Sequence, residues 1–210
     1  MARIQTIQEE RWNVITHGFG FILALIGALW MLFDLPSIHQ KYLVLSILIY
    51  LFSQLFLYFC SAFYHYESVE SNKVRWRKMD HIAIYISIAG TYTPICLLVL
   101  IDSDGWKIFY TVWGITFFGV IWKMFFTGKF EVFSSLLYLI MGWLIVLDID
   151  TLRVAFTDSM MFWLIVGGAF FTIGIIFYAW NKLAFNHVIW HFFVLGGSVS
   201  HYIMVKEVVG

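Results

Sequence analysis

Two histidines near the end of the chain stand four residues apart, in the sequence H-V-I-W-H, at His187 and His191. Four residues of helix bring two side chains to one face, about 6 Å apart, so that two imidazoles can share a metal ion. The spacing alone is only moderately specific. Two histidines with their polar tips among lipid headgroups would give the same pattern.

Two other stretches carry groups of matching chemistry. His65 ends an apolar run in S-A-F-Y-H, with Ser61 one helical turn before it, and Asp80 opens another run in R-K-M-D-H. Taken separately, His65 reads as a histidine at a helix C-terminus and Asp80 as an N-terminal cap. Taken together with His187 and His191, they predict three imidazoles around one zinc ion with an open fourth position for water. A nearby carboxylate such as that of Asp80 can hold this water and accept its proton.

A third polar group lies near the start of the chain. Glu10, Asn13 and His17 are spaced i, i+3 and i+7, so they share one face of a helix. They are candidates for hydrogen-bonding partners of the metal ligands, although a structural polar stripe is an equal alternative. His201 lies about 15 Å along the helix axis from His191, and His81 points about 100° away from Asp80. We leave both outside the predicted site.

The elements that must position these groups are membrane spans. The chain has 210 residues, of which 61% are hydrophobic and 12% charged, against about 25% charged in soluble proteins. Apolar stretches without strict alternation exclude a β-barrel. We predict an all-α, polytopic membrane protein, a seven-transmembrane helix bundle in a single domain over residues 1–210, with a short polar segment at 1–13. The expected spans are Val14–Phe33, Leu43–Tyr64, Asp80–Ile101, Lys107–Phe126, Val132–Leu147, Met160–Trp180 and His187–Val205.

The fifth span is the weakest, because its apolar run is shorter than a usual crossing. Lysine and arginine gather on the face that receives the N-terminus, which predicts a cytoplasmic N-terminus and an outside C-terminus for a protein of the cell membrane. Six spans would give the same orientation, so charge does not fix the number. Seven spans bring His65, Asp80, His187 and His191 to one depth, whereas six would separate them by a bilayer. The predicted site therefore favours seven. The basic residues on the cytoplasmic face are Arg3, Arg11, Lys73, Arg75, Arg77, Lys78, Lys123, Lys129 and Lys182.

Composition excludes several other classes of function. The formal net charge is zero, so no basic excess is available to hold nucleic acid. The two cysteines, Cys60 and Cys96, lie in apolar runs without the spacing of a disulfide framework or a thiolate metal site. No phosphate-binding loop or dinucleotide-binding motif is present. Within the expected spans, Pro94 predicts a helix kink and several glycines predict close helix packing.

The ordered pattern E-x2-N-x3-H, S-x3-H, the aspartate of KMDHIAIYISIAGTYTP and H-x3-H resembles the hemolysin III family, the bacterial branch of the progestin and adipoQ receptor superfamily. The resemblance runs from Glu10 to about Tyr202. It implies seven spans with a cytoplasmic N-terminus, and a zinc ion held by His65, His187 and His191. It also implies a bound water positioned in part by Asp80, with Ser61 as the motif serine near the metal.

Three functions follow from these residues as expectations. The first is a zinc-dependent hydrolase of membrane lipid amides or esters, in which Asp80 shuttles a proton and Ser61 orients the water or the oxyanion. Eukaryotic relatives in the superfamily are linked to hydrolysis of lipid amides such as ceramide. The second is a non-catalytic sensor of membrane lipid state with a structural zinc. The third is a pore-forming cytolysin, for which the sequence offers no amphipathic insertion helix.

Overall fold

The computed structural model describes residues 5–36 and 40–210, and these residues contain helices and no strand. Seven helical stretches among them are long and apolar enough to cross a membrane, as predicted. Arg3, which entered the charge comparison, lies outside the described residues. The helices are α1 (Ile7–Phe33), α2 (Leu43–Tyr66), α3 (Glu70–Pro94), α4 (Gly105–Phe126), α5 (Glu131–Trp143), α6 (Ile149–Ala155), α7 (Asp158–Ala179) and α8 (Asn186–Val209).

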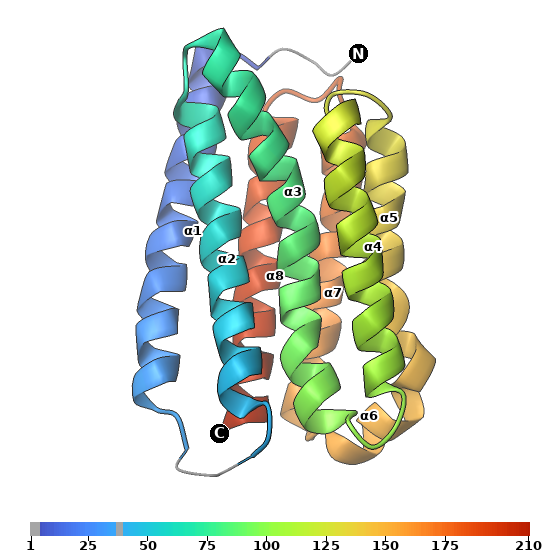
Figure 1. Ribbon diagram of the computed structural model, residues 1–210. Coiled ribbons are helices and arrows are strands. Elements are labelled where there is room, and N and C mark those ends of the chain that lie inside the picture. The colour runs from blue at the N-terminus through green and yellow to red at the C-terminus, as the bar shows by residue number, and fades with distance from the viewer. Residues whose placement is uncertain (1–4, 37–39) are drawn as a thin grey trace.

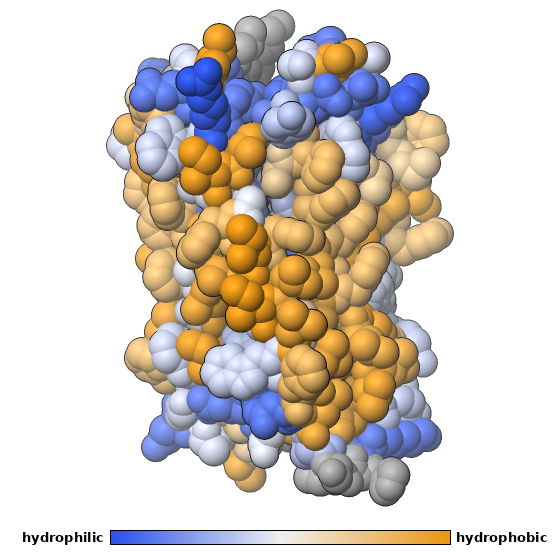
Figure 2. Space-filling model, turned by 90° about the vertical axis from the view of Figure 1, so that its left-hand side faces the viewer, coloured by the Kyte–Doolittle hydropathy of each residue, from blue (hydrophilic) through white to orange (hydrophobic). Residues whose placement is uncertain are grey.

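The helices form an elongated bundle with the two termini at opposite ends (Figure 1). α2 packs between α1 and α3, while α8 packs against α7, α1 and α3. On the face that Figure 2 shows, apolar side chains cover the middle of the molecule and polar residues gather at both ends. Phe52 on α2, Phe117 on α4 and Ile165 on α7 are large apolar side chains that are each more than half exposed. Such a surface is stable where lipid is the solvent, because hydrocarbon chains then cover it.

Several helix boundaries differ from those expected. α1 begins at Ile7 rather than Val14, because Thr6 and Glu9 form a capping box, so much of the predicted polar segment 1–13 is helical. α3 begins at Glu70, ten residues before the predicted start at Asp80. Span prediction follows apolar composition, whereas a helix can extend into the polar boundary of the bilayer with exposed charged side chains.

The short fifth span is completed by two further segments. α5 is followed by a 3₁₀ segment, Leu144–Asp148, and by α6, so that the stretch from Glu131 to Ala155 is long enough to cross. The sequence from Asp148 onward was expected to be a loop, and this was wrong for Ile149–Ala155. Tyr92 secures the change of helix type, because its hydroxyl donates to the Gly142 carbonyl at 2.8 Å and accepts from the Ile145 N–H at 3.0 Å.

The predicted irregularity at Pro94 takes the form of a π-helical segment, Ile95–Val99, directly after α3. Among the glycines expected to allow close packing, Gly119, Gly167, Gly196 and Gly197 lie directly against aromatic or imidazole rings, whereas Gly114, Gly142 and Gly168 face open space. α2 and α3 approach each other closely at Gly90. A Cβ atom there would lie 2.1 Å from Ser53 Oγ and 2.5 Å from Ser53 Cβ.

Gly90→Ala should therefore destabilise the bundle by about 1–3 kcal/mol, because α2 and α3 must separate to admit the methyl group. We expect a fall of several degrees in the unfolding temperature of the purified protein. Gly114→Ala is the matched control, since nothing lies within 4 Å of its Cβ position and alanine favours helix. Equal unfolding temperatures for the two variants would contradict this packing.

Candidate metal centre

The candidate site lies at the end of the bundle that holds the N-terminus (Figure 1). α2 ends there, and α3 and α8 begin there. The turn into α8 is fixed by Asn186, whose side-chain amide donates to the carbonyls of Phe177 and Tyr178 at the end of α7, each at 3.3 Å. The first turn of α8 lies beside the last turn of α2, since the ring centroids of His187 and His65 are 5.0 Å apart.

Three histidines from these two helices converge. His65, His187 and His191 each offer a ring nitrogen, and the three nitrogens lie within 4.8 Å of one another. His65 and His191 are buried, and His187 is partly buried. The structure thus brings together the three histidines that the sequence singled out, and the cluster could hold a metal ion.

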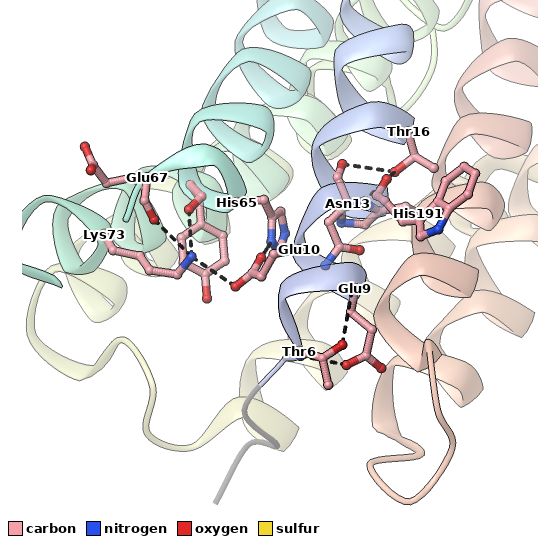
Figure 3. Close-up of polar contacts among 11 residues, drawn as sticks. Thr6, Glu9, Glu10, Asn13, Thr16, His65, Glu67, Lys73 and His191 are labelled. Carbon is pink, nitrogen blue, oxygen red and sulfur yellow. Dashed lines mark hydrogen bonds and ion pairs between the residues drawn. The ribbon is translucent and has the colours of Figure 1, made fainter. Parts of the chain in front are cut away.

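His65 is oriented by a residue of α1. Its Nδ1 lies 2.6 Å from Glu10 Oε2, and the other oxygen of Glu10 lies 3.0 Å from Lys73 Nζ (Figure 3). A carboxylate accepts only, so Nδ1 carries the proton and Nε2 has a free lone pair. His65 Nε2 is buried and has no hydrogen-bond partner within the described part of the chain. A bound cation would satisfy it.

His191 is oriented by Thr16, which the sequence analysis did not single out. Thr16 Oγ1 lies 3.0 Å from His191 Nδ1, and also 2.9 Å and 3.0 Å from the carbonyl oxygens of Trp12 and Asn13. Because those carbonyls take the hydroxyl proton, the hydroxyl oxygen accepts from His191 Nδ1 and leaves Nε2 as the donor atom for a metal. The sequence signal that could have identified Thr16 was its position next to His17 on the polar face of α1.

Glu9 is a second residue that the sequence analysis missed. It is 1% exposed, and its Oε1 accepts from the backbone N–H of Phe185 at 2.7 Å, while Oε2 accepts from the N–H of Thr6 at 2.8 Å. One carboxylate thus caps α1 and ties it to the residue that precedes α8. The capping-box spacing T-x-x-E at Thr6 was the available signal.

Asn13 and His17 lie beside the cluster but do not hydrogen-bond to its histidines through their side chains. The His17 ring stacks on that of His191, with centroids 3.4 Å apart and an interplanar angle of 12°. Neither the amide atoms of Asn13 nor the ring nitrogens of His17 have a hydrogen-bond partner among residues 5–36 and 40–210. Of the three residues expected on this face, Glu10 alone makes the predicted kind of contact.

Ser61 and Asp80 are both buried at this end of the bundle. Ser61 lies one turn before His65 on α2 and therefore on the same face of that helix. Asp80 lies within electrostatic range of Tyr178, whose ring centroid is 5.8 Å from that of His187. Their chemical roles remain predictions.

A separate charged cluster surrounds Glu131 at the start of α5. Glu131 Oε2 lies 2.8 Å from Lys123 Nζ and 3.4 Å from His81 Nδ1, and Oε1 lies 3.7 Å from Arg77. The Lys123 side chain is fully buried. This cluster joins α3, α4 and α5, and none of its members is one of the three clustered histidines. It explains why His81 points away from them.

The donor set suits a first-row divalent ion. Neutral imidazole nitrogens bind zinc at about 2.0–2.1 Å, and three of them leave one tetrahedral position open. Copper, nickel and iron accept the same ligands, so the three histidines identify the position of a metal site but not the identity of its metal. The unpartnered Nε2 of His65, and the two Nδ1 atoms tied to α1, are what a three-histidine metal centre requires.

Comparison with known proteins agrees with this architecture. Residues 5–202 match the family described as Haemolysin-III related. The chain is 36% identical over 200 residues to a hemolysin-3 homolog of Bacillus subtilis, covering 95% of this chain and 94% of the relative. It is 38% identical over 203 residues to hemolysin-3 of Bacillus cereus, covering 96% and 92%.

A more distant similarity extends to animals. The human monocyte to macrophage differentiation factor is 25% identical over 203 residues, which cover 94% of this chain and 83% of the human protein. The region of this chain that matches the family, residues 5–202, contains all three clustered histidines. This chain is a multi-pass membrane protein and belongs to the haemolysin-III-related family.

Proposed function

We propose that the protein is a zinc-dependent hydrolase of membrane lipids that carry an amide or ester bond. The observation that carries the proposal is the convergence of His65, His187 and His191, with their nitrogens within 4.8 Å, inside a bundle whose surface is apolar. Three neutral imidazoles with an open fourth position are typical of catalytic zinc rather than of closed structural sites.

A zinc ion held by these residues would supply Lewis acidity and bring the pKa of water to about 7. The chain supplies the remaining functions. Glu10 and Thr16 hold the rings of His65 and His191 so that their Nε2 atoms point to the centre. The carboxylate of Asp80 accepts the proton of the attacking water and returns it to the leaving group. The Ser61 hydroxyl donates to the developing oxyanion.

The lipid substrate follows from where the site lies. The histidines lie near one end of membrane-spanning helices, at the depth of the headgroup boundary, so a lipid carbonyl can reach them sideways from one leaflet. Basic residues concentrate at this end, including Arg75, Arg77 and Lys78 on the first turns of α3. We propose that this end is cytoplasmic, as the positive-inside rule predicts, and that the membrane is the cell membrane.

The metal itself is tested by elemental analysis of the purified protein. We expect about one zinc per chain in the wild type and loss of at least nine-tenths of it in His187→Ala, because two imidazoles alone bind zinc weakly. His201→Ala is the control. Its ring packs against Gly167 on α7, away from the cluster, so its zinc content should match the wild type. Equal zinc in all three proteins would contradict the site.

Asp80→Asn tests the catalytic role. Because the amide cannot accept a proton, we expect hydrolysis of lipid amides or esters to fall by about 10²–10⁴-fold while zinc content is unchanged. Asp158→Asn, an exposed residue of α7, is the control and should retain full activity. If the zinc-loaded wild type releases no product from either lipid class, the metal is structural and the hydrolase proposal is wrong.

Glu10→Gln tests the orientation of His65. The amide is a weaker acceptor for Nδ1–H and also loses the ion pair with Lys73, so zinc affinity should fall about 10–100-fold. Competition with a chelator of known affinity measures this change. Glu70→Gln, an exposed glutamate at the same end of the bundle, is the matched control. An unchanged affinity in Glu10→Gln would show that the carboxylate does not tune the ligand.

A further inference from the structure

Lys73, near the start of α3, bonds to both of the helices that precede it. Its Nζ lies 3.0 Å from Glu10 Oε1 and donates to the carbonyl oxygens of Tyr64 at 3.4 Å and Glu67 at 3.2 Å. An ammonium group has three donors and no acceptor, so these three partners use its full capacity. The ammonium also lies 5.1 Å from the centroid of the Tyr64 ring. One side chain therefore joins the start of α3 to α1 and to the end of α2.

The two carbonyl contacts hold the ammonium of Lys73 in place beside the metal ligand of α2. Tyr64 lies in the last turn of α2 and Glu67 is its C-terminal cap. The last carbonyls of a helix have no partner within the helix, and a positive charge near them is favourable. His65 directly follows Tyr64 in the chain. The position of the ammonium is thus fixed relative to the backbone that carries His65.

The carboxylate of Glu10 lies between Lys73 and His65. Oε1 of Glu10 faces Lys73 at 3.0 Å, and Oε2 lies 2.6 Å from His65 Nδ1 (Figure 3). The Glu10 side chain is 22% exposed. Without Lys73, this carboxylate could rotate about its last side-chain bond and turn toward water at the end of the bundle. Lys73 therefore restrains the acceptor that orients the His65 ring.

The face of α3 that carries Lys73 also carries Asp80, because seven residues are about two turns of helix. Neighbouring basic residues of α3 have other partners. Arg77 lies 3.7 Å from Glu131 of α5, and Lys78 donates to a carbonyl near the end of α4 at 3.1 Å. Lys73 is thus the basic side chain of α3 that contacts the metal-binding side of the bundle.

We propose that Lys73 is a positioning residue of the metal centre, which holds the Glu10 carboxylate where it fixes the ring of His65. This role rests on the metal centre in the proposed function but not on turnover, because zinc affinity measures it. A zinc-loaded protein that releases no lipid product would contradict the hydrolase and leave the role of Lys73 intact.

Lys73→Met tests the role, because it keeps most of the apolar stem and removes the ammonium. We expect zinc affinity, measured by competition with a chelator, to fall about 5–10-fold, which is less than the loss expected for Glu10→Gln. Lys78→Met is the matched control. Lys78 lies on the same helix and also bonds to a carbonyl near a helix end, that of Met124, so its removal should leave zinc affinity unchanged. Unchanged affinity in Lys73→Met would overturn the proposal.

The double variant Glu10→Gln/Lys73→Met separates positioning from general stabilisation. If Lys73 acts through Glu10, its removal should change zinc affinity by less than about twofold once Glu10 is already glutamine. If Lys73 only stabilises the helix ends, the same fold loss will occur with either residue at position 10, and the proposal is wrong. The unfolding temperature of the zinc-free protein should fall in both cases, because the carbonyl contacts are lost either way. A wild type that binds no zinc would overturn the metal centre and the role of Lys73 together.

Discussion

The approach of His65 on α2 to His187 and His191 on α8 is the contact on which the rest of the structure depends. More than a hundred residues separate these helices in the chain, and both must present imidazoles at the same depth. α8 begins on the side where α2 ends only if an even number of crossings lies between them, and there are four. The fifth crossing is thus required by the site, although its α-helical part is short and a 3₁₀ segment and α6 complete it.

α1 orients the imidazole rings that meet in this contact. It lies between α2 and α8, and its first three turns touch both (Figure 3). Glu10 reaches His65 on one side, and Thr16 reaches His191 on the other. Glu9 fixes the start of α1 to the chain just before α8. A shift of α1 along its axis would break all three contacts at once. The axial position of α1 therefore determines the orientation of both imidazole rings.

The sequence predicted the spans and the histidine cluster because both depend on strong, simple signals. An apolar run of about 20 residues has few alternatives in a bilayer, and intramembrane histidines must find partners. Helix ends were less predictable, as at Glu70 and Ile7, because capping and exposed polar turns extend helices beyond their apolar parts. The roles of Thr16 and Glu9 in the site were not predicted, because polar residues near a helix start usually make only local contacts with the backbone.

The cluster around Glu131 determines where Asp80 lies, because it holds α3 in place. Glu131 contacts Arg77, one turn before Asp80, and His81, the residue after it, so that α5 holds α3 on both sides of the aspartate. Lys123 balances the charge of Glu131 at 2.8 Å, and Arg77 adds a second positive charge. Charge is also present on the metal-binding side of the bundle, in the buried Glu9 carboxylate and in the Glu10–Lys73 pair that joins α1 to α3. The ion pairs around Glu131 thus join α3, α4 and α5, whereas α2 and α8 contribute the three histidines and α1 contributes the groups that orient two of them.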